Sequence, residues 1–291
     1  METEGDACGG RTKTLEGLGE KKGARKAVKC RALIVHPLFS NSKRIEAISK
    51  TEYKRSVAVR FIGIPLVLDL AQYDLFGSKS VGTGGTLWYV ENILAEYVIR
   101  RLAKKTDRFC AIELGCGASP VAGMALWALG LDVVFTDLKE CLNRTRENLR
   151  RNASAVLKTS RLLNRAPGKV HVEELMWGTK DVPREVAAHG PFDLILCSDC
   201  IYQRKLHPLL VQTLSTLLTK NNCCMLAYQT RDSAVERAFF CDVLAKTDMK
   251  HKPISIKDIV KEMLPLWPLP MQEFLSKKDP DDYFKVYSIS L

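Results

Sequence analysis

The sequence predicts an α/β protein with a doubly wound, mostly parallel β-sheet and an N-terminal β-hairpin extension. From Phe109 to Ala245, short apolar segments of strand length alternate with helix-prone segments, and such alternation is typical of parallel sheets with helices on both faces. A glycine-rich turn, Glu113–Val121 (ELGCGASPV), joins the first of these strands to the helix after it. The chain has 291 residues and 46% apolar residues, enough to bury the core of this architecture.

The N-terminal part divides into a polar tail and a hairpin. Residues 1–29 are rich in Gly, Lys, Glu and Thr, so we expect a disordered tail. Residues 1–60 hold 14 Lys/Arg and 7 Asp/Glu, which is +7 of the net charge of +11. Such a basic tail can attract acidic partners or nucleic acid, and a merely solvated tail is the alternative. In the extension, 30–85, the β-branched runs on either side of Gly63 predict a β-hairpin.

The remaining residues, 86–291, are predicted to form one domain. Apolar side chains at helical spacing predict a helix at Trp88–Lys104. Short apolar runs predict strands at Phe109–Leu114, Asp132–Asp137, Val170–Leu175, Phe192–Ser198, Cys223–Thr230 and Tyr283–Ser290. The segments between them predict helices at Pro120–Leu129, Lys139–Leu163 (with Asn152 as a candidate interruption), Leu206–Leu218 and Ser233–Ala245. Residues 251–282, which contain the exposed-looking LPLWPLP, are expected to be an elaboration at the sheet edge before the last strand.

The turn between the first strand and the first helix of the sheet predicts a cofactor site. Gly115 and Gly117 lack side chains, so backbone N–H groups can approach a ligand closely. Ser119 suits a helix N-cap, and Pro120 suits the first helical position. Asp137 ends the next strand 22 residues after Gly115, where a carboxylate is placed to accept hydrogen bonds from ribose hydroxyls. The pattern therefore indicates a nucleotide-like cofactor.

The same turn discriminates between cofactors. The dinucleotide fingerprint G-x-G-x-x-G fails at Pro120, and no P-loop Gly-Lys-Ser/Thr follows the glycines. Glu113 directly precedes them, and its carboxylate would repel a pyrophosphate but suit an ammonium or a sulfonium. S-adenosylmethionine combines a positive sulfur, an amino-acid tail and an adenosine. The sequence therefore favours S-adenosylmethionine, and a glycine-rich turn without a ligand is the alternative.

Several strand ends are expected to converge on this site. In a doubly wound sheet, ligands bind outside the carboxyl ends of the strands, where the strand order reverses. Trp177, just past the third strand, is placed to stack on an adenine ring, with a core or loop tryptophan as the alternative. Asp199 and Tyr202 follow the fourth strand and put an acid and a phenol where a methyl group would emerge. The alternative for Asp199 is a helix-capping aspartate.

Cysteine usage and hydropathy bear on other classes of protein. The ten cysteines fall mostly in apolar or helical stretches, as expected for reduced thiols in the cytoplasm or the nucleus. Cys197 and Cys200 form C-x-x-C, but no second pair of ligands has zinc-site spacing, and the motif ends a strand. We therefore predict no metal. No segment reaches the ~18 apolar residues of a membrane span, and no hydrophobic signal core is present, so no membrane partner is expected.

Four segments, ELGCGASPV, TDLK, EELMWG and FDLILCSDCIY, occur in the order and spacing that resemble methyltransferase family 16. The upstream GTLW, Gly85–Trp88, resembles the tryptophan motif before the cofactor core of that family. The similarity covers roughly Ser56 to Ala245 and the last strand. It implies a Rossmann-like class I methyltransferase fold with seven strands. The family's acidic-x-x-aromatic hallmark corresponds to Asp199 and Tyr202.

The resemblance also implies roles for individual residues. Asp199 and Tyr202 would hold the target side chain. Two departures from the family pattern are Ser119, where many members have a third glycine, and Ser198, which is often alanine. The residues after Trp88, Tyr89 and Val90, are also larger than those that often follow the tryptophan. Cofactor contacts are implied for Trp88, Gly115, Cys116, Gly117, Asp137, Trp177 and Ser198, and the charge argument above adds Glu113.

The implied activity is methyl transfer from S-adenosylmethionine to a lysine of a specific non-histone protein, such as a chaperone, an AAA ATPase or a translation factor. The attacking amine must be neutral, whereas free lysine has a pKa of about 10.4. A cationic cofactor and a desolvated pocket would lower that pKa. Asp199 could orient the amine, and the Tyr202 ring could flank it through a cation–π contact.

Three alternatives stay open at this stage. A nucleic-acid adenine methyltransferase would carry Asn/Asp-Pro-Pro-aromatic where this chain has Asp-Cys-Ile-Tyr, although the basic charge keeps RNA open. The acceptor could instead be a protein N-terminus or a histidine. The third alternative is a catalytically silent scaffold that binds the cofactor and partner proteins. We expect a monomer.

Overall fold

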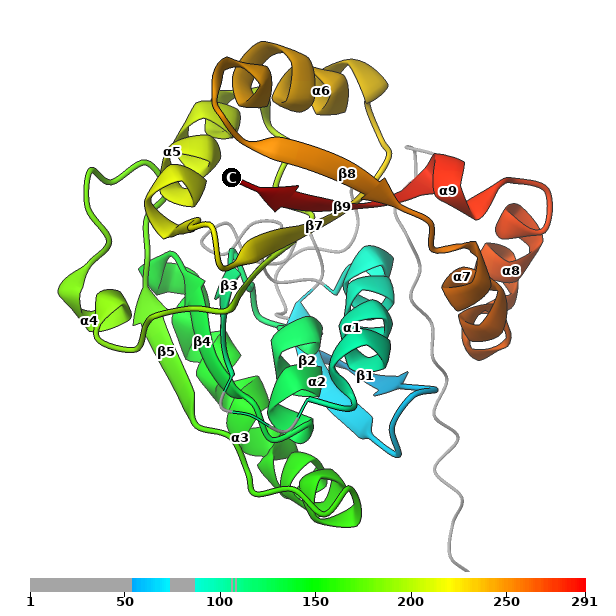
Figure 1. The fold of residues 1–291 in the computed structure, drawn as a ribbon. Coiled ribbons are helices and arrows are strands. Elements are labelled where there is room, and N and C mark those ends of the chain that lie inside the picture. Colours follow the sequence, from blue (N-terminus) through cyan, green and yellow to red (C-terminus); the bar gives the residue numbers. More distant parts are fainter. Residues whose placement is uncertain (1–53, 74–86, 106, 108) are drawn as a thin grey trace, which may run out of the picture. The chain divides into compact units, whose positions relative to one another are not determined.

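The computed structural model describes residues 54–73, 87–105, 107 and 109–291 (Figure 1). The predicted tail, 1–29, and much of the predicted extension lie outside these residues. The predicted hairpin is confirmed: β1 (Lys54–Arg60) pairs antiparallel with β2 (Val67–Tyr73).

Seven strands form the main sheet, and the predicted doubly wound, mostly parallel arrangement is confirmed. The strand order is β5-β4-β3-β6-β7-β9-β8, and only β9 runs antiparallel to its neighbours. From β3 the chain moves out to β5 and then returns to the other side of β3 with β6. The order therefore reverses between β3 and β6, as in Rossmann-like folds. The strands are β3 (Cys110–Leu114), β4 (Asp132–Asp137), β5 (Val170–Glu174), β6 (Leu194–Ser198), β7 (Cys223–Gln229), β8 (Lys250–Ile254) and β9 (Phe284–Ser290).

Helices cover both faces of this sheet, as alternating side chains of its strands require. On β6, Leu194 and Leu196 belong to one apolar cluster, whereas Ile195 and Cys197 belong to the other. The first cluster includes residues of α1 (Tyr89–Leu102), α2 (Val121–Ala128) and α3 (Lys139–Leu162). The second includes residues of α4 (Arg184–Ala187) and α5 (His207–Leu217) (Figure 1).

The predicted helix at Ser233–Ala245 is not continuous. The α-helical part, α6, ends at Ala238 and is followed by a π-helical turn, Phe239–Val243, and a 3₁₀ turn. Phe239 and Phe240 are both buried, although neighbouring residues of a regular helix point about 100° apart. Phe239 packs on His207 at 5.4 Å between ring centroids, and Phe240 packs on Tyr287 at 4.6 Å. The wider turn accommodates both contacts.

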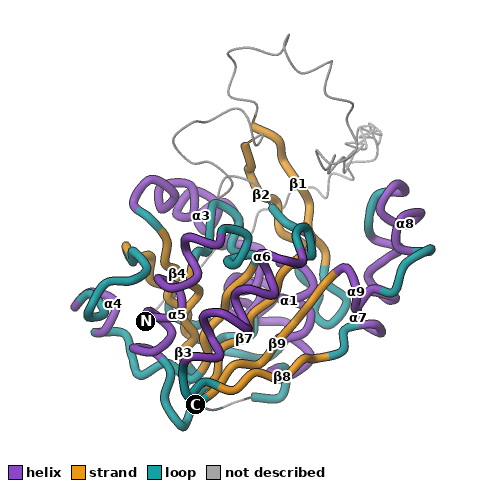
Figure 2. Tube along the Cα trace, turned by 90° about the horizontal axis from the view of Figure 1, so that it is seen from above, coloured by secondary structure: helices purple, strands orange, loops and turns teal. Residues whose placement is uncertain are grey.

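The elaboration before the last strand contains a strand that the sequence analysis missed. This strand, β8, pairs antiparallel with β9 at the edge of the sheet. It contains Pro253, and proline in a sheet is usual only at edges. The connection from β8 to β9 consists of three short helices that Figures 1 and 2 show gathered at one end of these strands. They are α7 (Lys257–Met263), α8 (Leu269–Leu275) and α9 (Pro280–Tyr283).

The interpretation of LPLWPLP as exposed is wrong for its tryptophan. Trp267 is only 7% exposed and packs edge-on against Tyr89 of α1 and Phe284 of β9, at 5.3 and 5.8 Å. Leu266 and Leu269 beside it are exposed. Packing of Trp267 on α1 and β9 therefore attaches the elaboration to the core of the domain.

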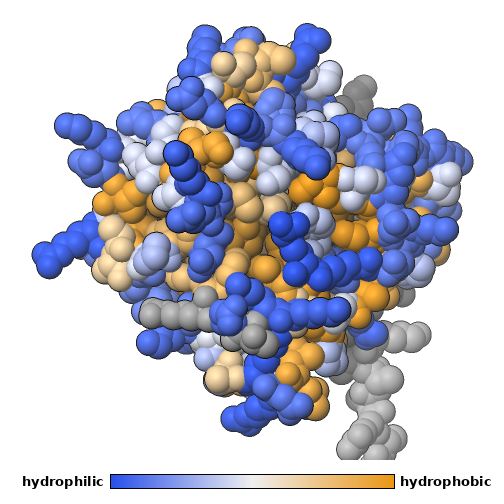
Figure 3. All heavy atoms as spheres, in the orientation of Figure 1, coloured by the Kyte–Doolittle hydropathy of each residue, from blue (hydrophilic) through white to orange (hydrophobic). Residues whose placement is uncertain are grey.

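Figure 3 shows polar side chains over much of one face, with apolar residues visible between them. Within the described ranges, the helices are all too short or too polar to span a membrane.

Two asparagines on α3 attach the hairpin to the domain. Asn148 accepts a hydrogen bond from the Ala71 N–H (2.8 Å) and donates to the Ala71 C=O (2.9 Å). Asn152 makes the same pair of bonds with Asp69, at 2.7 and 2.9 Å. Residues four apart share one face of a helix, and residues two apart share one side of a strand. The candidate interruption at Asn152 is therefore wrong: α3 is continuous, and Asn152 serves as a docking residue.

We expect Asn148→Ala to lower the free energy of unfolding by about 3 kcal/mol, because it leaves buried backbone groups of β2 without partners. Urea unfolding measures the loss. Asn143→Ala, at an exposed position of the same helix, is the matched control and should cost less than about 0.5 kcal/mol. Equal losses for the two variants would contradict the docking role.

Candidate functional site

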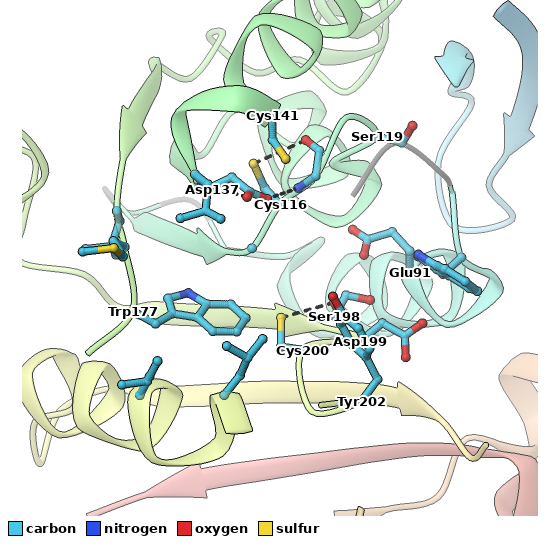
Figure 4. A pocket seen from close by; sticks show the side chains of 18 residues that line it. Glu91, Cys116, Ser119, Asp137, Cys141, Trp177, Ser198, Asp199, Cys200 and Tyr202 are labelled. Carbon is cyan, nitrogen blue, oxygen red and sulfur yellow. Dashed lines mark hydrogen bonds between the residues drawn. The ribbon is translucent and has the colours of Figure 1, made fainter. Parts of the chain in front are cut away.

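A cavity of about 400 Å³ lies at the carboxyl ends of the central strands (Figure 4). Its walls come from the carboxyl ends of β3, β4, β5 and β6 and the residues after them, and from the starts of α1, α3 and α5. The structure thus brings nine of the ten predicted site residues together, while their individual roles stay predictions. The nine are Trp88, Gly115, Cys116, Gly117, Asp137, Trp177, Ser198, Asp199 and Tyr202.

The glycine-rich turn requires its two glycines. Gly115 and Gly117 have φ angles of +64° and +60°, in the region that side chains disfavour. A Cβ on Gly115 would also lie 2.8 Å from the Trp177 ring. Asp137 holds the turn, because one carboxylate oxygen accepts the Gly117 N–H (2.7 Å) and the other accepts the Leu138 N–H (2.7 Å). Burial raises the pKa of Asp137, and these two donors limit the rise.

Ser119 does not cap the helix α2, although the sequence analysis predicted that it would. The helix α2 starts after Pro120 and has no side-chain cap, so Ser119 is not its N-cap. The Ser119 hydroxyl is buried, lines the cavity and has no hydrogen-bond partner among the described residues. A buried hydroxyl without a partner costs roughly 1–3 kcal/mol. A ligand with polar groups would satisfy it, which agrees with the amino-acid tail of the predicted cofactor.

The opposite wall is apolar. Four of the ten large apolar residues that the described chain exposes line this one cavity: Leu138, Met176, Tyr202 and Leu209. Leu138, Met176 and Leu209, together with Trp177, provide a surface for the flat face of a ring such as adenine. The cavity therefore offers polar groups at one side and an aromatic surface at the other.

Glu113 is buried and does not line the cavity, and its contact with the cofactor stays a prediction. Its carboxylate accepts the Gly123 N–H (3.0 Å) inside the protein. Glu91 of α1, which the sequence analysis missed, lines the cavity instead and accepts the Ala122 N–H (3.0 Å). Figure 4 shows Glu91 directed between Ser119 and Ser198.

The two buried glutamates influence each other. Burial raises the pKa of Glu91 and, with the nearby charge of Glu91, raises the pKa of Glu113 well above its ordinary value. The pair therefore retains a proton at pH values at which exposed glutamates are ionised. No sequence pattern pairs these residues, since α1 and β3 meet only through tertiary packing.

Asp199 forms an ion pair that the sequence analysis did not predict. Arg231, which the sequence analysis missed, forms a two-pronged ion pair with its carboxylate at 2.6 and 2.8 Å. The guanidinium also lies over the Trp88 ring, 4.4 Å from its centroid. Arg231 follows β7, the strand beside β6. A basic residue just past the end of a neighbouring strand is the signal that could have found it.

Two groups with metal-ligand chemistry occur in the described chain. Cys197 and Cys200 are buried among apolar residues. His171, Glu173 and His189 each offer a ligand atom within 4.8 Å of the others. However, the two imidazoles stack with centroids 3.7 Å apart and planes 24° apart. Each nitrogen lone pair lies in the plane of its ring, so stacked rings do not point at one ion, and the absence of a metal stays a prediction.

Comparisons with known proteins give matches among lysine methyltransferases. Residues 69–246 match the family model described as lysine methyltransferase. Mouse (Mus musculus) protein N-lysine methyltransferase METTL21A is 30% identical over 154 residues, which cover 53% of this chain and 64% of that protein. For EEF1A lysine methyltransferase 3 of Xenopus tropicalis the identity is 30% over 135 residues, 46% of this chain and 52% of that protein. Protein-lysine N-methyltransferase EFM6 of Saccharomyces cerevisiae is 29% identical over 206 residues, which cover 61% of this chain and 78% of that protein. The chain thus spans less than two thirds of the first two of these relatives.

We expect Gly115→Ala to weaken S-adenosylmethionine binding by about tenfold or more, because the new methyl group meets Trp177 and the backbone is strained. Isothermal titration calorimetry measures this. Gly130→Ala is the matched control, since Gly130 also has a positive φ (+78°) and lies at the far end of α2. It should lower the melting temperature and leave binding unchanged. Unchanged binding by Gly115→Ala would show that the turn does not form the binding wall.

The buried glutamate pair predicts a pH dependence of stability. Because the folded-state pKa of Glu113 is raised, the folded protein holds a proton that the unfolded chain releases above about pH 4.5. The free energy of unfolding should therefore fall as pH rises above that value. Glu113→Gln, whose amide oxygen can still accept the Gly123 N–H, should flatten this fall.

Urea unfolding of wild type and variant between about pH 5 and about pH 8 measures the slope. Glu185→Gln, at an exposed position of α4, should leave the slope of the wild type unchanged. If the free energy of unfolding depends on pH equally in the wild type and in Glu113→Gln, the glutamate pair does not hold the additional proton.

Proposed function

The chain belongs to the lysine methyltransferase family, and from this membership we propose that it transfers a methyl group from S-adenosylmethionine to a lysine of a non-histone protein. The observation that carries the proposal is the single cavity in which the glycine-rich turn and Asp137 lie beside Asp199 and Tyr202. The printed names of the relatives, one of which specifies EEF1A, support a protein acceptor.

The cavity residues fit the cofactor. Asp137 would accept hydrogen bonds from the ribose hydroxyls. Trp177 and the apolar side chains beside it would face the adenine, and the unpartnered Ser119 hydroxyl would bind the amino-acid end. S-adenosylmethionine would supply an electrophilic methyl group on a positively charged sulfur.

The acceptor lysine would enter at the rim. Tyr202 is 39% exposed there, so its ring can flank an incoming side chain. The apolar surroundings would lower the pKa of the lysine amine and favour its neutral, nucleophilic form. Positioning would then contribute most of the rate.

We propose that the protein acts as a monomer in the cytoplasm or the nucleus. Six of the eight described cysteines are buried thiols, which supports a reducing environment. RNA, a protein N-terminus or a histidine remain alternative acceptors, and a cofactor-binding scaffold remains the non-enzymatic alternative.

The test is labelling with tritiated S-adenosylmethionine in a lysate of the source organism. Wild type should label a discrete protein band that resists nuclease and disappears with protease. Asp199→Ala should reduce the label at least about tenfold, because it removes the side chain beside the acceptor entrance. Mass spectrometry of the band identifies the methylated residue.

Asp137→Ala separates cofactor binding from acceptor choice. We expect it to weaken S-adenosylmethionine binding by about tenfold or more in calorimetry, since the variant loses the carboxylate that would meet the ribose. Label that nuclease removes would favour a nucleic-acid acceptor. Tight cofactor binding without any label would favour the scaffold.

A further inference from the structure

We propose that Arg231 is a positioning residue of the acceptor site: it holds Asp199 as an ionised anchor and fixes Trp88 in the cavity wall. This inference rests on the proposed function. It changes the role of Asp199, which would then support the site and would not itself orient the acceptor amine.

The ion pair occupies most of the Asp199 carboxylate. Nη1 and Nη2 of Arg231 donate to Oδ1 and Oδ2 at 2.8 and 2.6 Å, and the Gln229 N–H donates to Oδ1 at 3.3 Å. The Asp199 side chain is 7% exposed and that of Arg231 is 24% exposed. Paired, short, charge-assisted bonds of this kind fix geometry as well as charge. Little of the carboxylate is left to bind an amine.

The backbone at Asp199 needs such an anchor. Its φ of +57° lies in the left-handed region, which aspartate enters more readily than most side chains but at some cost in strain. The Asp199 N–H donates to the Ala227 C=O at 2.7 Å. Main chain and side chain of Asp199 are therefore both attached to β7 and the residues after it. The turn that leads to Tyr202 starts from this fixed point.

The same guanidinium supports the cavity wall. Its carbon lies 4.4 Å from the centroid of the Trp88 ring, within the range of a cation–π contact. Trp88 precedes α1, whereas Asp199 follows β6. Arg231 thus connects two segments that are distant in the sequence and that both line the cavity.

The ion pair between Arg231 and Asp199 also affects the protonation state of the acceptor lysine. An unpaired carboxylate beside the acceptor would stabilise the ammonium form of lysine, which cannot attack a methyl group. With Arg231 in place, the net charge of the pair is zero. A pair without net charge would not hold the lysine in its unreactive ammonium form.

A double-mutant cycle of Arg231→Met and Asp199→Asn tests the inference. In Asp199→Asn the amide oxygen can still accept from Arg231, so label transfer at saturating tritiated S-adenosylmethionine should stay within about tenfold of wild type. In Arg231→Met a buried carboxylate loses its counter-charge and Trp88 loses its support. Transfer should fall by about a hundredfold, and S-adenosylhomocysteine should bind about tenfold more weakly.

The double variant removes both charges, so it should transfer at least about tenfold faster than Arg231→Met. The pH profile of Asp199→Asn should match that of wild type. Arg204→Met is the matched control, because Arg204 forms an ion pair with Asp242 at 2.7 Å on the exposed surface. Its cofactor affinity and transfer rate should equal those of wild type.

Two results would overturn the inference. One is an Asp199→Asn variant as inactive as Arg231→Met, with no recovery in the double variant, because a proton acceptor cannot be replaced by an amide. The other is wild-type S-adenosylhomocysteine affinity and transfer in Arg231→Met. If the wild type transfers no label, the proposed function fails. The positioning role is then decided by binding alone: an S-adenosylhomocysteine affinity of Arg231→Met equal to that of the wild type overturns it.

Discussion

The hydrogen bond from the Gly117 N–H to the Asp137 carboxylate, 2.7 Å long, is the interaction on which the site depends. It joins the turn after β3 to the end of β4, so the two strand ends keep one geometry. The helix α3 supports this turn from behind, because Thr145 donates to the Gly117 C=O at 2.7 Å and Asn148 donates to the Ala118 C=O at 2.6 Å. Asn148 also carries the hairpin. One helix face therefore positions both the cofactor turn and the extension that precedes it.

The acidic side chains around the cavity are held in different ways, and their environments divide their roles. Asp137 stays close to two backbone donors, which suits an acceptor of hydroxyl hydrogen bonds. Asp199 is neutralised by Arg231. Glu91 and Glu113 share a buried region in which a proton replaces the missing counter-charge. Carboxyl groups around one cavity thus differ in charge and in hydrogen bonding according to what surrounds them.

The sequence predicted the fold and most of the cavity because those depend on local signals. The alternation of strands and helices, the glycines and the carboxylate after β4 are all visible along the chain, and β4 was predicted with its observed bounds. Arg231, Glu91 and the burial of Trp267 could not be predicted, since each depends on packing between segments distant in sequence. Strand β8 was missed because Pro253 and its polar neighbours lack the apolar alternation of a strand. Ser119 was misassigned because α2 begins one residue later than predicted for such a cap, with Pro120 at the N-cap position.

The composition of β8 has a consequence for the protein at high concentration. An outermost strand presents unpaired backbone groups that can recruit a strand from another molecule. In β8, Lys250, Lys252 and Pro253 are exposed. The proline lacks an N–H to donate, and the two positive charges would repel the same strand of a second copy. This edge therefore resists intermolecular sheet growth, which protects the open sheet from aggregation at a strand that takes no part in the cavity.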